Sequence, residues 1–334
     1  MSAQTAPIAV VLPRDPVLTA TRAHGRTSGL VMAVVSALAF SSSGPFIKPL
    51  LEAGWSLGAA LLVRMGVAGL ILSPALVRAI LRERSFLRRH WPLIVGFGLT
   101  AVAGCQIFFF SAMQRMPVAV ALLIQYLAPV LLVGYTWLRT RRAPSRLVAL
   151  GSVVAIVGLV LVVDIAGARF DLLGTVFALC AAVCVMAYFL ISERAGDDLP
   201  PLALAAGGLL TGAALIAVLA VVGVFPIAAP AVTVTLAGVD VPWFVPLVWV
   251  AAIGTTLGYA FGVAAVPRIG SRVASFIGLS EVLFALGFAW IFLGEAPGPV
   301  QLVGGVLILA GVVLVRLDSD YESARASSSS GTTR

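Results

Sequence analysis

Ten long apolar segments divide this chain, and their length is the feature that most limits how it can fold. A helix that crosses the hydrocarbon core of a bilayer needs about 20 mostly apolar residues, and it satisfies its own backbone polar groups there. Hydrophobic residues make up 60% of the chain and charged residues only 11%, which excludes an ordinary soluble domain. We therefore expect an all-α integral membrane protein with ten transmembrane helices, at Leu30–Leu51, Leu57–Ile80, Leu93–Met113, Val118–Leu138, Leu147–Ile165, Leu172–Ile191, Leu202–Val224, Trp243–Val266, Val273–Leu293 and Val300–Val315.

The second half of the chain repeats a residue pattern of the first half. Trp290 follows Trp137 by 153 residues, and the same offset joins three pairs of glycines, Gly134 with Gly287, Gly151 with Gly304 and Gly158 with Gly311. Farther upstream, Ala101 and Gly104 match Ala251 and Gly254 at an offset of 150, which indicates loops that changed length. Five spans in each copy force the second copy to enter from the opposite face of the membrane. The sequence predicts two inverted five-helix repeats, at residues 30–165 and 172–316.

Basic residues are distributed unevenly between the two predicted faces of the membrane. Arginines gather in the connections after even-numbered spans, whereas Lys48, Arg115 and Arg169 are the only basic residues on the other face. By the positive-inside rule, both termini are expected in the cytoplasm of a prokaryote-like cell, with the chain in the plasma (inner) membrane. Residues 1–29 and 317–334 are expected to be disordered cytoplasmic tails. Cytoplasmic loops account for most of the net charge of +8, so no nucleic-acid partner is expected.

The residues that metal, haem or nucleotide chemistry requires are scarce. The three cysteines fall inside predicted spans without metal-ligand spacing, and both histidines lie outside the spans. The chain has one lysine and no phosphate-binding loop. We expect no metal site, no cofactor and no ATP-driven motor, so any transport would be secondary.

The repeated passage resembles EamA-type transporters of the drug/metabolite transporter superfamily. The resemblance rests on Tyr126–Val130 in the first half and, in the second half, on Ser280–Ala285, Trp290–Glu295, Gln301–Gly305 and Ala310–Gly311. Two departures from the family pattern are Val282 in place of a proline and Thr140-Arg141-Arg142 in place of Leu-Gly-Glu. The resemblance implies a ten-helix inverted-repeat fold around a central cavity that opens alternately to each side. It also implies export of amino acids or other small metabolites.

Glu281 is the clearest candidate for a working residue, since a charged side chain at membrane depth costs roughly 2.5–3.5 kcal/mol. It lies near the middle of the ninth span, with Gly278 and Ala285 on the same helix face leaving room for a neighbouring group or a cavity. Burial favours its neutral form, so it could carry a proton and couple proton entry to substrate exit. The structural alternative is that Glu281 only hydrogen-bonds a broken helix or pairs with Arg64.

Other polar groups at membrane depth are weaker candidates for substrate binding. Arg64 could bind a carboxylate, but snorkelling to the surface or structural pairing is the favoured interpretation. Pro45 predicts a kink or local unwinding of the first span, which would expose backbone and hydroxyl groups near it. The remaining candidates are Ser42, Ser43, Gln106, Gln125, Tyr126, Tyr188, Thr255 and Tyr259. Gly254, Gly258 and Gly262 form a row of small residues that is expected to pack against another helix.

These observations favour a secondary transporter that exports an amino acid or other small metabolite by alternating access, with protons as the candidate coupling ion. One alternative is an uncoupled importer or facilitator, in which Glu281 only stiffens the ninth helix. A second is a membrane-embedded enzyme on lipid-linked substrates, for which Asp197-Asp198 is the sole candidate acid pair. Besides the small-molecule substrate, the expected partner is membrane lipid, and a homodimer is an alternative to a single chain.

Overall fold

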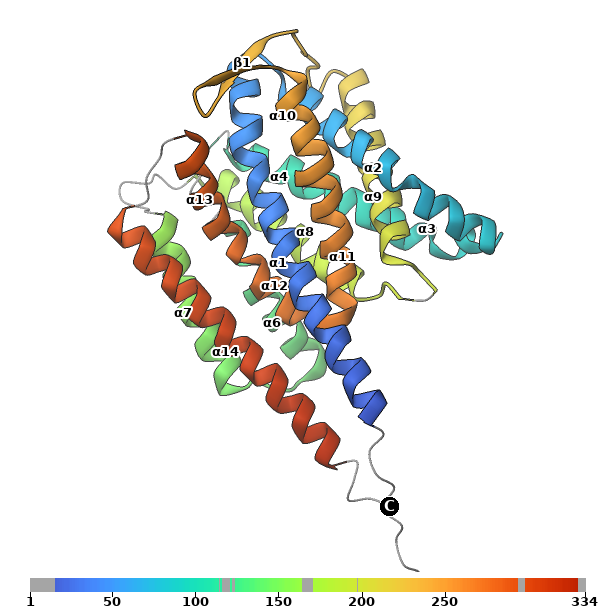
Figure 1. Cartoon of the computed structure of the whole chain (residues 1–334), viewed down its shortest axis with the longest axis vertical. Helices are drawn as coiled ribbons and strands as arrows, with labels where there is room; N and C mark the ends of the chain where they lie inside the picture. The colour runs from blue at the N-terminus through green and yellow to red at the C-terminus, as the bar shows by residue number, and fades with distance from the viewer. Residues whose placement is uncertain are drawn as a thin grey trace, which may run out of the picture.

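The computed structural model describes residues 16–113, 115, 121, 124–163, 171–196, 198–293 and 298–329. These residues form a bundle of long helices with a small β-hairpin at one end (Figure 1). The first half comprises the helices α1 (Pro16–Glu52), α2 (Leu57–Arg82), α3 (Phe86–Phe97), α4 (Cys105–Met113), α6 (Ala128–Thr140) and α7 (Arg146–Val163). The second half comprises α8 (Leu172–Ser192), α9 (Pro201–Val221), the strands β1 (Thr233–Leu236) and β2 (Val239–Pro242), α10 (Phe244–Trp249), α11 (Gly258–Ile269), α12 (Ser271–Gly278), α13 (Ser280–Leu293) and α14 (Pro299–Ser329).

The chain is a multi-pass membrane protein. Seven helical segments are long and apolar enough to cross a membrane by length and composition, at Gly25–Glu52, Leu57–Arg82, Phe86–Ala112, Leu172–Ser192, Pro201–Val221, Phe244–Ile269 and Ser271–Phe292. Two shorter apolar helices lie at Arg146–Leu161 and Pro299–Val315. Of the predicted span at residues 118–138, several residues lie outside the described part of the chain, and α6 forms its second half. The ten-helix arrangement therefore stays a prediction.

Two segments in the middle of spans are π-helical, and they occupy matching positions in the two halves. The first, η1 (Gly98–Gly104), connects α3 to α4, and the second, η2 (Val250–Leu257), connects α10 to α11. Each contains the alanine and glycine that the sequence pattern matches at an offset of 150. Single turns of π-helix inside α-helices are frequent at functional sites.

The helices α7 and α14 are repeat-related, and they pack against each other through their matching glycines. A β-carbon at Gly158 would lie 2.6 Å from the carbonyl oxygen of Gly304, and one at Gly311 would lie 2.6 Å from that of Gly151. The two helices are therefore antiparallel and in backbone contact. Because Gly151 matches Gly304 and Gly158 matches Gly311, exchanging the two helices reproduces the same contacts, as a two-fold axis between repeats would.

The glycine row of the eighth predicted span packs as expected. A β-carbon at Gly258 would lie 2.8 Å from the ring of Phe40, and β-carbons at Gly254 and Gly262 would collide with the hydroxyls of Ser43 and Ser36. All three of these contacts are with α1. The prediction that this row receives another helix is confirmed.

The β-hairpin is a correction to the expected all-α fold. Its two strands pair antiparallel, with Thr233 opposite Pro242 and Leu236 opposite Val239. Ala237 and Gly238 both have positive φ angles, 50° and 80°, which matches the two-residue turns that suit hairpins. Val234 and Leu236 cover the last turns of α1.

At the hairpin end, the first half of the chain is joined to the second half by hydrogen bonds. The indole nitrogen of Trp55 donates to the carbonyl of Pro230 at 2.9 Å, and the backbone nitrogen of Ser56 donates to the carbonyl of Ala228 at 2.8 Å. The ring centroids of Trp55 and Trp243 lie 5.3 Å apart. These contacts connect the α1–α2 turn to the segments on either side of the hairpin.

The two predicted tails are partly helical, which is a second difference from expectation. The helix α1 begins at Pro16, and α14 continues to Ser329, so both helices extend beyond the apolar spans. No proline interrupts the chain between Pro16 and Pro45 or after Pro299. Once a helix has formed, each residue added to its end gains one hydrogen bond, so the two helices can extend into the predicted tails.

Candidate functional site

A cavity of about 150 Å³ lies between helices of the two halves. Its walls come from α1, η1, α4, α8, α11, α12 and α13, together with Gln125. The polar side chains that line it are Ser36, Gln106, Gln125, Tyr188, Tyr259 and Glu281. Five of these six were predicted from the sequence as site residues, and they come from both repeats.

Glu281 lies in the first turn of α13 and is partly buried. Tyr126 interacts with the Glu281 carboxylate, although Tyr126 does not itself line the cavity. The charge of Arg64 attracts the carboxylate, but no salt bridge within 4.0 Å joins these two described residues. The predicted cavity beside Glu281 is therefore present, with Gly278 on its wall.

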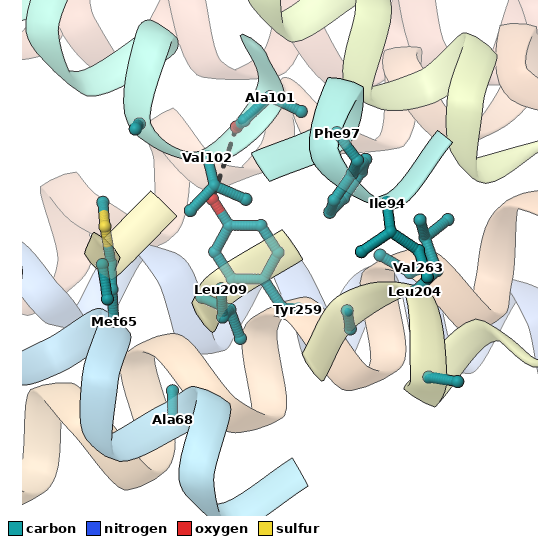
Figure 2. Close-up of a cluster of buried hydrophobic side chains, with 14 of the residues drawn as sticks. Met65, Ala68, Ile94, Phe97, Ala101, Val102, Leu204, Leu209, Tyr259 and Val263 are labelled. Atoms are coloured by element: carbon teal, nitrogen blue, oxygen red, sulfur yellow. Dashed lines mark hydrogen bonds between the residues drawn. The ribbon is translucent and has the colours of Figure 1, made fainter. Parts of the chain in front are cut away.

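Aromatic rings form one wall of the cavity. The rings of Phe40 and Tyr259 meet edge to face with centroids 5.1 Å apart, and the centroids of Tyr188 and Tyr259 are 6.0 Å apart. Figure 2 shows Tyr259 among buried apolar side chains, with its hydroxyl pointing to the carbonyl of Ala101 in η1, to which it donates at 3.4 Å. The hydroxyl of Tyr188 is buried and has no hydrogen-bond partner among the described residues.

The amide side chains of Gln106 and Gln125 form a polar part of the cavity wall. The amide nitrogen of Gln125 lies 3.7 Å from the sulfur of Cys105, which is a weak acceptor. The amide oxygen of Gln125 is buried without a hydrogen-bond partner in the described part of the chain. A buried polar group left unpaired costs about 1–3 kcal/mol. Two such groups, the hydroxyl of Tyr188 and the amide oxygen of Gln125, therefore belong to residues that line the cavity.

Arg64 and Thr255 form a separate site beside the cavity. The guanidinium nitrogen Nε of Arg64 donates to the hydroxyl of Thr255 at 3.1 Å, and that hydroxyl donates to the carbonyl of Val250 at 2.8 Å. Arg64 is only 8% exposed, so the expectation that it snorkels to the surface is wrong. The side chain instead connects α2 of the first half to η2 of the second.

Neither Ser42 nor Ser43 lines the cavity: Ser42 contacts Trp249 at the end of α10, and Ser43 lies against Gly254 of η2. Ser42 donates to the carbonyl of Ala39 at 2.7 Å and accepts from the indole nitrogen of Trp249 at 3.1 Å. The helix α1 continues through Pro45 and Pro49, so the predicted local unwinding is wrong. The hydroxyls of Ser41 and Ser42 donate to carbonyls one turn earlier, whereas the buried hydroxyl of Ser43 has no hydrogen-bond partner among the described residues.

Ser36, Phe40 and Cys105 are among the residues of the cavity wall that sequence reasoning missed. Ser36 could have been found from the sequence, because it is a hydroxyl inside an apolar span. In the structure it donates to the carbonyl of Gly258 at 2.7 Å. Phe40 and Cys105 carry no such signal, since both are ordinary residues of apolar helices. Their positions follow only from how the helices rotate against each other.

Metal-site and acid-pair chemistry finds little support among the described residues. No group of three or more His, Cys, Asp or Glu side chains there could hold a metal ion. Of the candidate pair Asp197-Asp198, the first lies outside the described residues. Asp198 is exposed and pairs with Arg89 at 3.3 Å.

Comparison with known proteins places the chain among membrane transporters. A probable terminal-alkyne amino-acid exporter from Streptantibioticus cattleyicolor is 28% identical over 291 residues, which cover 84% of this chain and 91% of that protein. The threonine/homoserine exporter RhtA of Escherichia coli (strain K12) is 29% identical over 219 residues, or 64% of this chain and 67% of that protein. A solved crystal structure of a protein 20% identical in sequence matches the fold with a TM-score of 0.69, covering 88% of this chain and 99% of that chain.

A family model matches both halves of the chain separately. The EamA-like transporter family model matches residues 27–164 and again residues 172–317. The two matches coincide with the two halves that the repeated glycines and tryptophans define. With the apolar helices and the shared cavity, they identify this chain as a member of the EamA-like transporter family.

Proposed function

We propose that this protein exports an amino acid or another small metabolite by alternating access, through the cavity between its two repeats. The observation that carries the proposal is that both repeats contribute polar side chains to one cavity at membrane depth. Transporters of inverted-repeat design hold their substrate near the bilayer midplane, between the repeats. The ten-helix arrangement, a location in the plasma membrane and cytoplasmic termini are part of this proposal.

The chemistry of the cavity suits a small zwitterion. The unpaired amide oxygen of Gln125 would accept from an ammonium group, while the amide nitrogen of Gln106 and the hydroxyl of Tyr188 would donate to a carboxylate. A volume of about 150 Å³ equals about five waters at roughly 30 Å³ each, well below the 300–1,000 Å³ typical of drug-sized ligand sites. The names of both relatives specify amino-acid export, which supports the same substrate class.

Glu281 is proposed as the residue through which proton entry drives export. It is an acid at membrane depth, beside the cavity, with no direct salt bridge to the nearest buried cation, Arg64. Such a carboxylate can exchange a proton when the cavity opens to either side. The rival role is uncoupled transport, in which Glu281 only binds the substrate ammonium or stiffens its helix.

The test is transport by the full chain in liposomes loaded with a pool of amino acids. An imposed pH gradient should drive loss of one solute, and Glu281→Gln should abolish that loss while keeping the side chain's shape. Exchange of labelled for unlabelled solute without a gradient should persist in Glu281→Gln, because exchange needs binding and opening but no net proton transfer.

Glu52→Gln is the matched control, since it removes an exposed acid at the end of α1 and should transport normally. If Glu281→Gln abolishes both the gradient-driven loss of solute and the exchange of labelled solute, the residue is needed for binding, and the coupling role is contradicted. Gradient-driven loss that survives in Glu281→Gln would exclude any essential part for it. A cavity-filling Gly278→Leu should stop all transport, and unimpaired transport in that variant would contradict the cavity as the route.

A further inference from the structure

A second and larger cleft, of about 740 Å³, lies on the outer side of the bundle between α2, α9 and α11. Its inner part is apolar, with Leu72 and Ala75 from α2 facing Ala260 and Phe261 from α11. Its outer part carries three exposed arginines, Arg78 and Arg82 at the end of α2 and Arg268 at the end of α11. No residue of this cleft lines the cavity that contains Glu281.

On both sides of the cleft, apolar residues come first along the chain and arginines follow near the end of the helix. On α2, Leu72 precedes Arg78 by six residues, and Leu257 at the end of η2 precedes Arg268 of α11 by eleven. At 1.5 Å per residue, these distances are about 9 Å and about 17 Å. The cleft is therefore an elongated apolar groove that ends in a cationic rim. Neighbouring side chains on α2 and α9 are exposed and apolar, for example Val77 at 49% and Leu202 at 41%, as on a lipid-facing surface.

The rim keeps a net positive charge, because its three arginines outnumber the two carboxylates that line the cleft. Two carboxylates also line the cleft, but Asp198 pairs with Arg89, outside the cleft, and Glu83 accepts from the hydroxyl of Ser85 at 2.5 Å. No carboxylate forms a salt bridge with Arg78, Arg82 or Arg268 among the described residues. Arg268 donates to the carbonyl of Ala264 in its own helix, which holds it along the groove wall.

We propose that this cleft binds one phospholipid with an anionic headgroup. The headgroup phosphate bonds the three guanidinium groups, and one acyl chain fills the apolar groove between α2 and α11. Guanidinium pairs phosphate with two parallel hydrogen bonds, and basic clefts between transmembrane helices recruit anionic lipids by this charge. The site is independent of the substrate cavity, so it does not depend on what the protein transports.

Native mass spectrometry of the full chain tests this proposal. The protein is equilibrated with equal amounts of phosphatidylglycerol and phosphatidylethanolamine that have identical acyl chains. We expect one phosphatidylglycerol to be retained in preference. Each arginine near an anionic headgroup contributes roughly a fivefold change in binding, so the triple variant Arg78→Gln, Arg82→Gln and Arg268→Gln should lower retention about 100-fold.

The matched control removes the same charge elsewhere. Arg84→Gln, Arg88→Gln and Arg142→Gln alter three exposed arginines that do not line the cleft, and this triple variant should retain the lipid as the parent does. A second variant, Ala260→Phe, keeps every arginine but fills the groove, and it should also lose the lipid. Equal retention of the two lipids, or equal losses in both triple variants, would overturn the proposal. Displacement of the lipid by soluble glycerol phosphate at similar concentration would also overturn it, because a headgroup site alone would then suffice.

Discussion

At the scale of single residues, the contact between Arg64 and Thr255 is the polar link between the two halves whose loss is easiest to interpret. Thr255→Val keeps the shape of the side chain but removes the acceptor of a buried guanidinium. A hydrogen bond to a charged group contributes about 1.5–3 kcal/mol, against about 0.5–1.5 kcal/mol for one between neutral groups. We therefore expect Thr255→Val to lower the thermal unfolding temperature in detergent clearly.

The adjacent residue supplies the control for this prediction. The hydroxyl of Thr256 donates to the carbonyl of Ala251 at 2.8 Å and has no charged partner among the described residues. Thr256→Val should therefore destabilise the protein less than Thr255→Val does. Equal shifts of the unfolding temperature in the two variants would mean that Arg64 does not depend on Thr255.

How much of the site the sequence could predict is also decided at the residue scale. Glu281, Gln106, Gln125, Tyr188 and Tyr259 were predicted because a polar group inside an apolar span needs a reason, and the structure brings them to one cavity. The same reasoning selected Arg64, Ser42, Ser43 and Thr255, none of which lines that cavity. Polarity places a residue inside the bundle, but only the rotation of each helix decides which interior site it reaches.

At the scale of elements, the contacts of Gly158 with Gly304 and of Gly151 with Gly311 between α7 and α14 lead to a testable prediction. Alanine is the better helix former by about 1 kcal/mol, so Gly→Ala at an open helical position stabilises or is neutral. Gly158→Ala should do the reverse, because its β-carbon would lie 2.6 Å and 2.7 Å from backbone atoms of Gly304 and Ile308. Overpacking of this kind costs about 1–3 kcal/mol.

Gly134, in the middle of α6, is the matched control, since a β-carbon there meets nothing within 4 Å. Thermal unfolding should therefore fall in Gly158→Ala and stay level or rise in Gly134→Ala. A rise in both variants would contradict the close approach of the two repeat-related helices.

The sequence carries no signal for the π-helices, but it does carry one for the hairpin. The π-helices η1 and η2 have the same apolar composition as their α-helical neighbours, so nothing in the sequence marks the shift of hydrogen-bond partner. The hairpin did have a signal, since Thr233–Leu236 and Val239–Pro242 alternate in polarity around Ala237-Gly238. The apolar runs, in contrast, predicted the long helices well because each must satisfy its own backbone in the bilayer.

At the scale of the whole molecule, the start of α1 and the end of α14 lie at the same end of the bundle, and the hairpin lies at the other (Figure 1). We expect the two ends to face opposite sides of the membrane. In intact cells, a membrane-impermeant maleimide should label Gly238→Cys in the hairpin turn. The reagent should reach Ser329→Cys at the end of α14 only after the membrane is opened.

The parent chain serves as the background for this labelling, because its own cysteines all lie in spans. Labelling of Ser329→Cys in intact cells, with Gly238→Cys protected, would reverse the proposed orientation. Equal labelling of both variants in intact cells would contradict an odd number of crossings between the two sites.

The two tryptophans at the hairpin end give the molecule an optical signal of its own. Trp55 belongs to the first half and Trp243 to the second; their rings lie 5.3 Å apart, and Trp55 is only 5% exposed. Indoles this close exchange excitation energy, and a shielded indole emits at shorter wavelength than a hydrated one. Any motion that separates the two halves at this end would hydrate Trp55 and shift its emission to the red, a change that can be followed without an attached dye once the other four tryptophans are replaced.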